Sequence, residues 1–142
     1  MSKVIEKMVY EYASSMSLLI VDDEAFTLRE YKSLFENFFN SVDTASNGEE
    51  AYRKWNLGKK KYDLIITDIM MPKMNGLELI SKIRLKSPSQ HILVLSAIKD
   101  INQMRATLAL GVEGILEKPY NHQTMIYVLS RVLKLIYNNK LI

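Results

Sequence analysis

Four short polar motifs follow apolar runs of the sequence, and their side chains could bind a divalent cation and an anion. The motifs are Asp22-Asp23-Glu24, Asp68, Ser96-Ala97 and Lys118-Pro119. Carboxylates that are brought together without a cation repel one another and lose favourable hydration. Mg²⁺ removes that repulsion and suits a site of a few carboxylates, a backbone carbonyl and waters. The donors of Lys118 and Ser96 could then hold an incoming phosphoryl group.

Each motif has an ordinary structural explanation when it is taken alone. An Asp-Asp pair after a strand often only caps the next helix, and Asp68 by itself fits a solvated loop. A single Ser-Ala or Lys-Pro pair is close to uninformative. The occurrence of all four in order, each at the end of a successive apolar run, is what points to function.

The elements that would position these motifs alternate between short apolar runs and longer helical patterns. The apolar runs predict strands over 17–22, 42–45, 62–67, 91–95 and 112–116. The helical spacing predicts helices over 24–39, 47–58, 77–85, 100–110 and 123–137. Five strands alternating with five helices predict a doubly wound α/β domain with a parallel sheet. Ligands bind beyond the carboxyl ends of such strands, so the four motifs should meet at one edge.

Residues 1–16 lie outside this alternation. Their apolar side chains, Val4, Ile5, Met8, Val9 and Tyr12, form a helical stripe and predict an extra N-terminal helix. This helix either packs on its own domain or forms a dimer or partner surface. We therefore divide the chain into a helical extension at 1–16, a main domain at 17–138 and a tail at 139–142.

Composition excludes several classes of protein. A chain of 142 residues with 48% hydrophobic and 25% charged side chains fits one globular domain. There is no Cys, which excludes disulfides and thiolate metal sites. The net charge of +3 predicts no nucleic-acid partner, and we interpret Lys59-Lys60-Lys61 as a solvated loop. With no apolar run long enough to cross a membrane, we expect a cytoplasmic domain that binds neither membrane nor DNA.

Taken together, the motifs resemble the receiver domain of two-component response regulators. The resemblance rests on Asp22-Asp23-Glu24, the run from Asp68 to Gly76, Ser96-Ala97 and Lys118-Pro119-Tyr120. Asn47 to Ala51 and Ala109 to Val112 are also similar to the family's usual entries to its second helix and fifth strand. The resemblance covers 16–137, identifies 17–138 as the receiver domain and implies the strand order 2-1-3-4-5.

The resemblance also implies a role for each site residue. Asp68 would be the phosphoacceptor and would accept its phosphoryl group from a sensor histidine kinase or phosphotransfer protein. Asp23, Asp68 and the Met70 backbone carbonyl would bind Mg²⁺ directly, with Asp22 holding a coordinated water. Lys118 would pair with one phosphoryl oxygen.

The remaining implications concern Ser96, the cis peptide and the output. The Ser96 hydroxyl would move to bond a second phosphoryl oxygen, and the Lys118–Pro119 peptide would be cis. The output would be a downstream protein target or output domain. The chain would be no enzyme in the usual sense, although it would support its own phosphorylation and dephosphorylation.

Three positions make the sequence distinctive within that resemblance. Ile115 stands where the family has an aromatic switch residue, and its branched side chain cannot swap between solvent and a ring pocket. Met70 and Ile98 stand where polar side chains could orient a hydrolytic water. We therefore hypothesise slow autodephosphorylation.

Alternatives to a phosphoacceptor switch stay open at this point. One is a receiver-like scaffold that binds partners without phosphorylation, which Ile115 favours slightly and the acidic residues disfavour. Another is a metal-dependent phosphohydrolase, which would need an acid/base carboxylate where Met70 stands. The pattern fits a monomer or a homodimer formed through the last helix. It also fits either a complete single-domain regulator or part of a longer protein.

Overall fold

The computed structural model describes residues 2–97 and 100–140, which form one parallel sheet with helices on both faces. The strands are β1 (Ser17–Val21), β2 (Ser41–Ala45), β3 (Leu64–Thr67), β4 (Ile92–Ser96) and β5 (Gly114–Glu117). The helices are α1 (Ser2–Ala13), α2 (Ala25–Phe35), α3 (Gly48–Asn56), α4 (Gly76–Lys86), α5 (Ile101–Ala109) and α6 (His122–Lys140). The strand order is β2-β1-β3-β4-β5, so the predicted fold class, with its N-terminal helix, is confirmed.

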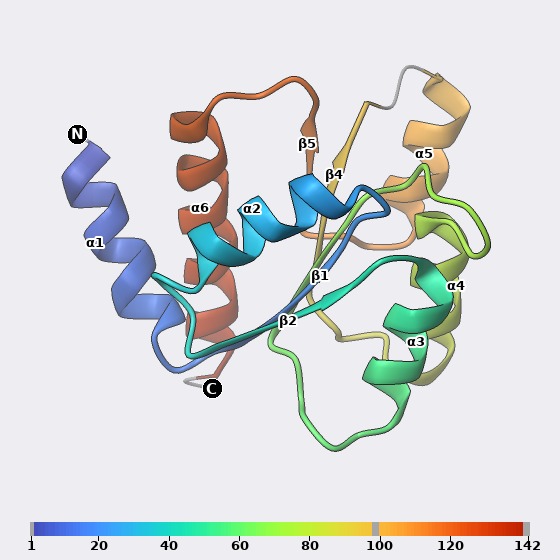
Figure 1. The fold of residues 1–142 in the computed structure, drawn as a ribbon, viewed down its shortest axis with the longest axis horizontal. Helices are drawn as coiled ribbons and strands as arrows, with labels where there is room; N and C mark the ends of the chain where they lie inside the picture. The colour runs from blue at the N-terminus through green and yellow to red at the C-terminus, as the bar shows by residue number, and fades with distance from the viewer. Residues whose placement is uncertain (1, 98–99, 141–142) are drawn as a thin grey trace.

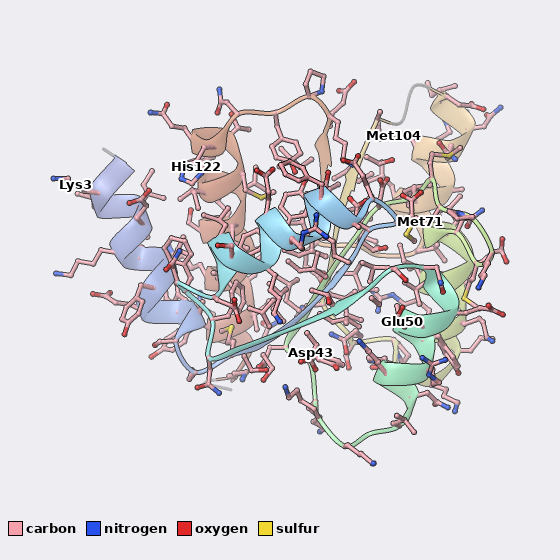
Figure 2. The ribbon with its side chains drawn as sticks, viewed as in Figure 1. Lys3, Asp43, Glu50, Met71, Met104 and His122 are labelled. Atoms are coloured by element: carbon pink, nitrogen blue, oxygen red, sulfur yellow. The ribbon has the colours of Figure 1, made fainter. Side chains whose placement is uncertain are left out.

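Two apolar clusters, one on each face of the sheet, hold the layers together. Helices α1, α2 and α6 lie on one side and α3, α4 and α5 on the other (Figure 1). The first cluster joins Phe35 and Leu129 to the sheet, and the second joins Leu79 to it. Met71 and Met104, labelled in Figure 2, pack against this second cluster. Because both faces of the sheet are covered, its central strands are continuous apolar runs.

The register of the sheet brings the carboxyl ends of the strands to one edge. Val21 of β1 pairs with Thr67 of β3, so the residues that follow them, Asp22 and Asp68, stand at the same level. Ser96 of β4 pairs with Glu117 of β5, the residue before Lys118. The expected convergence of the four motifs therefore follows from strand pairing.

The helix predicted over 24–39 is shorter than its apolar spacing suggested. Helix α2 ends at Phe35, and the backbone N–H groups of Phe38 and Phe39 both bond to the Phe35 carbonyl as the chain turns. Phe39 is nevertheless buried in the first cluster. Its apolar character reflects packing of the turn rather than a continued helix.

Helix α1 packs on its own domain. Val9 and Ala13 are fully buried, and the Tyr12 ring lies 5.1 Å from the Tyr137 ring of α6. Helix α1 runs beside α6 in the same direction (Figure 1). This contact covers part of the apolar surface of α6 that suggested a dimer. Helix α6 also extends to Lys140, so only residues 141–142 of the predicted tail lie outside the described residues.

Candidate functional site

Three carboxylates meet at the carboxyl edge of the sheet. Asp22 and Asp23 follow β1 and Asp68 follows β3, and one oxygen from each lies within 4.8 Å of the others. Asp22 is only 4% exposed, whereas Asp23 is exposed. A cluster of carboxylate oxygens that differ in burial is the donor set that a hard divalent cation prefers.

Lys118 supplies a positive charge to this cluster. Its Nζ lies 3.0 Å from Asp68 Oδ2 and 3.7 Å from Asp22 Oδ2. The Lys118 backbone N–H also bonds to the Ser96 carbonyl at 3.0 Å, which ties the lysine to the end of β4. The Lys118–Pro119 peptide is cis, as expected. The ammonium group is therefore placed where it can neutralise an anion bound at Asp68.

The environment of Asp22 favours binding of a cation. Burial raises the pKa of the Asp22 carboxyl above 3.8, and the charges of Asp68 and Asp23 raise it further. The Glu24 backbone N–H, at 2.9 Å from Asp22 Oδ1, and Lys118 lower the pKa in part. The Glu24 N–H and Lys118 thus offset only part of the cost of burying the negative charge of Asp22. A divalent cation would supply the missing charge, so the donor set and its electrostatics both fit Mg²⁺.

The loop after Asp68 folds tightly over the backbone of that residue. Asp68 Oδ1 accepts the Ile69 backbone N–H at 2.7 Å, and the Gly76 backbone N–H bonds to the Ile69 carbonyl at 2.8 Å. A Cβ at Gly76 would lie 2.2 Å from the Asp68 carbonyl oxygen. Asn75 then caps α4 by accepting the Glu78 backbone N–H. Gly76 is therefore needed for the close approach that fixes the Asp68 backbone.

We expect Gly76→Ala to lower the free energy of unfolding by about 1–3 kcal/mol, because the added methyl group forces backbone apart. Urea denaturation measures this change. Gly114→Ala is the matched control, since its Cβ would meet only a side-chain carbon of Leu93 at 3.4 Å. Equal stability of Gly76→Ala and the wild type would contradict the close approach.

Ser96 is fully buried at the end of β4, and its hydroxyl has no hydrogen-bond partner among the residues that the structure describes. A buried hydroxyl without a partner destabilises the folded state, and a hydrogen bond to an acceptor removes that cost. The Lys118 backbone N–H bonds to the Ser96 carbonyl, so the Ser96 hydroxyl lies close to the end of β5, where Lys118 follows. The hydroxyl is thus available for a bound anion.

Ile115 and Met70 occupy different environments. Ile115 is partly buried and packs against the second cluster, so it fills the face opposite to α1, α2 and α6. Met70 is 65% exposed, and its sulfur accepts a weak hydrogen bond from Gln103 Nε2 at 3.7 Å. Ile98, the other position in the dephosphorylation hypothesis, lies outside the described residues.

A pair of tyrosines that the sequence did not indicate lies beside the carboxylate cluster. The hydroxyl group of Tyr31 on α2 is hydrogen-bonded to the hydroxyl group of Tyr120, two residues after Lys118. Burial, and then the charges of Asp22 and Asp68, raise the pKa of Tyr31 to about 12. Nothing in the sequence links positions 31 and 120, because their contact depends on the packing of α2.

The chain is similar to known proteins along most of its length. Residues 18–130 match the protein family described as "Response regulator receiver domain". The transcriptional regulatory protein YesN of Bacillus subtilis is 35% identical over 122 residues, which cover 82% of this chain and 32% of YesN. The chemotaxis protein CheY of Listeria monocytogenes is 31% identical over 120 residues, covering 84% of this chain and 99% of CheY.

Solved structures give the same similarity. The chain superimposes on one chain of the structure described as the CheX-CheY-BeF3-Mg+2 complex from Borrelia burgdorferi, with a TM-score of 0.75 and 30% identity, covering 82% of this chain and 88% of that chain. The chain spans half or less of the length of several curated relatives, YesN among them. Within the described residues, no helix has the length and apolar character needed to cross a lipid bilayer.

Proposed function

The chain belongs to the response regulator receiver domain family, the phosphoacceptor domains of two-component signalling, and from this we propose that Asp68 is the side chain that is phosphorylated. One Asp68 carboxylate oxygen would form a bond to the phosphorus of a phosphohistidine. The phosphorus–nitrogen bond would break, and the imidazole would leave as it takes up a proton. The observation that supports this proposal best is the position of Lys118, at 3.0 Å from Asp68 and 3.7 Å from Asp22.

The other residues of the site have separate roles in this proposal. Asp23, Asp68 and the Met70 carbonyl would hold Mg²⁺, and Asp22 would hold a coordinated water. The cation would neutralise charge on the phosphoryl oxygens. Lys118 would pair with one of these oxygens, and the buried Ser96 hydroxyl would donate to another. Asp68 is kept in place by its bonds to the loop backbone.

Reduction with sodium borohydride tests the identity of the acceptor. This reagent converts an acyl phosphate to an alcohol, so phosphorylated Asp68 would become homoserine. We expect peptide mass spectrometry to find this change at residue 68 after incubation with acetyl phosphate and Mg²⁺. Reduction at Asp22 or Asp23 in place of Asp68 would overturn the assignment.

Mg²⁺ affinity should fall as the pH is lowered. The pKa of the Asp22 carboxyl in the folded protein is raised above its ordinary value of 3.8. Protons therefore begin to compete with the cation at a higher pH than they would at an ordinary aspartate. For one displaced proton, the loss is about tenfold in affinity per pH unit below the raised pKa. Calorimetric titration of Mg²⁺ across the acid range measures it. An affinity that stays constant down to pH 3.8 on folded protein would contradict the raised pKa of Asp22.

We expect Met70→Asn to shorten the lifetime of the phosphorylated domain severalfold, because an amide can orient a water that the thioether cannot. Loss of the phosphoryl adduct over time, followed by intact mass, measures the change. Lys73→Asn introduces the same amide at an exposed position of the same loop and should leave the lifetime unaltered. Identical decay of Met70→Asn and the wild type would contradict slow autodephosphorylation.

The proposed phosphoryl donor is a sensor histidine kinase or a phosphotransfer protein, and the proposed output is contact with a downstream protein target or output domain. The chain spans only part of several relatives, so the output is proposed at the level of protein class. Location in the cytoplasm, where such donors present their phosphohistidine, is part of the same proposal.

A further inference from the structure

The Tyr31–Tyr120 contact joins the proposed acceptor site to two helices. Tyr31 lies in α2, where its ring stacks on Phe35 with centroids 6.0 Å apart. Tyr120 lies between Lys118 and Asn121, and the Asn121 side chain caps α6 by accepting the Thr124 backbone N–H at 2.8 Å. The short segment from 118 to 121 therefore has the lysine of the site at one end and the start of α6 at the other.

The Tyr31 hydroxyl group is protonated at neutral pH. The raised pKa of Tyr31 keeps its proton in place, so one hydroxyl donates and the other accepts. Both side chains are partly buried and pack against the first apolar cluster, which fixes their rings. The hydrogen bond therefore restrains the segment that follows Lys118, and so limits where the lysine ammonium can lie.

The Ile115 side chain lies on the other face of the sheet, so it does not contact the helices that the tyrosine pair contacts. Its side chain packs against the second cluster, with α3, α4 and α5, whereas the tyrosine pair packs against the first cluster with α1, α2 and α6. A branched aliphatic side chain has few rotamers and little reason to leave an apolar environment. A change at the acceptor would reach α1, α2 and α6 more directly through the segment 118–121.

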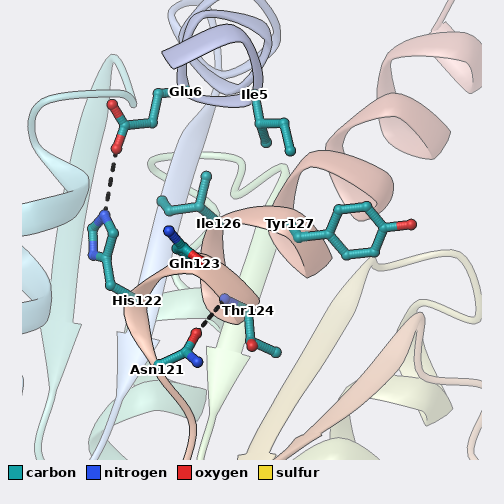
Figure 3. A pocket seen from close by; sticks show the side chains of 8 residues that line it. All are labelled: Ile5, Glu6, Asn121, His122, Gln123, Thr124, Ile126 and Tyr127. Carbon is teal, nitrogen blue, oxygen red and sulfur yellow. Dashed lines mark hydrogen bonds and ion pairs between the residues drawn. The ribbon is translucent and has the colours of Figure 1, made fainter. Parts of the chain in front are cut away.

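Beyond Tyr120, the start of α6 meets α1. His122 Nε2 lies 3.5 Å from Glu6 Oε1, and a cavity of about 390 Å³ opens beside this pair (Figure 3). Ile5 and Ile126 line the cavity from the two helices. Movement of the segment 118–121 would alter this seam, where an exposed polar contact, His122 with Glu6, joins the start of α6 to α1.

We propose that Tyr31 and Tyr120 form a positioning pair that holds Lys118 toward Asp68 and carries the effect of phosphorylation to the seam between α1 and α6. This inference rests on the proposed phosphorylation of Asp68. In this inference the tyrosine pair positions Lys118, and the effect of phosphorylation reaches the seam between α1 and α6 through that pair. Ile115 does not carry it.

A double-mutant cycle tests the positioning role. We expect Tyr31→Phe and Tyr120→Phe each to slow phosphorylation by acetyl phosphate about threefold to tenfold, the effect of one hydrogen bond. The double variant should be no slower than the slower single variant, because both lose the same bond. The Mg²⁺ concentration for half-maximal rate should be unchanged. Tyr127→Phe, which removes an exposed hydroxyl bonded to Arg131, is the control and should react like the wild type.

Hydrogen exchange tests the route of transmission. In the phosphorylated wild type we expect altered amide protection at 118–127 and 2–8, and in phosphorylated Tyr120→Phe we expect this change to be lost. Unaltered rates in the single variants, multiplied effects in the double variant, or changes confined to 101–117 would overturn the inference while leaving Asp68 phosphorylation intact. A wild type that forms no phosphoryl adduct would overturn the proposed function itself.

Discussion

Lys118→Ala is expected to slow phosphorylation of the chain by acetyl phosphate about 100-fold. This is the usual effect of removing one protein group that stabilises negative charge developing in the transition state. Lys118 Nζ lies 3.0 Å from Asp68 and 28% of its side chain is exposed, so it can move from the carboxylate to an incoming phosphoryl oxygen. The rate of adduct formation at saturating Mg²⁺, followed by intact mass, measures the effect.

Two further variants make the Lys118 result specific. Lys118→Arg keeps the charge with a different shape and should give an intermediate rate. Lys134→Ala removes an exposed lysine of α6 and should react like the wild type. Since Lys118 also offsets the charge of Asp22, its removal should not weaken Mg²⁺ binding. Wild-type phosphorylation rates for Lys118→Ala would contradict the role of its ammonium group.

Asp22→Asn and Asp23→Asn are expected to separate stability from function. Asp22→Asn removes a buried charge but keeps an oxygen for the Glu24 N–H, so the metal-free protein should gain free energy of unfolding. Mg²⁺ affinity should nevertheless fall about 10- to 100-fold, as for loss of a group that holds a bound water. Asp23→Asn removes a proposed direct ligand and should lower Mg²⁺ affinity further.

Thermal denaturation with and without Mg²⁺ measures both effects. The cation should raise the Tm of the wild type, because it binds the folded state, and this rise should shrink in both variants. Glu49→Gln removes an exposed carboxylate outside the cluster and should keep the full rise. An Asp22→Asn protein that is less stable without metal, or that keeps the full Mg²⁺ effect, would contradict the electrostatics of the site.

The fold could be predicted from sequence where hydrophobic spacing and burial agree. The run Leu18 to Val21 is apolar throughout because both faces of β1 are covered, so a buried strand was the only short element that fitted. The helical spacing gave a wrong prediction at Phe38 and Phe39, which lie beyond the end of α2. These side chains keep a helical period, but the chain is already turning, and Phe39 is buried from the turn.

The candidate site could be predicted as far as it depends on strand ends. Asp22, Asp68 and Lys118 meet because parallel pairing aligns the residues that follow β1, β3 and β5. The Tyr31–Tyr120 contact could not be predicted in this way, because it depends on how α2 crosses the sheet. Nor could periodicity show that the Met70 side chain is open to solvent.

The most direct test of Asp68 as the phosphoacceptor is the intact mass of the wild type and Asp68→Asn after incubation with acetyl phosphate, with Mg²⁺ or with a chelator. We predict one phosphoryl adduct that forms on the wild type only with Mg²⁺ and is absent from folded Asp68→Asn. A Mg²⁺-independent adduct, or one that persists in Asp68→Asn, would contradict Asp68 as the acceptor. No adduct on the folded wild type would contradict the switch and favour a scaffold that binds partners without phosphorylation.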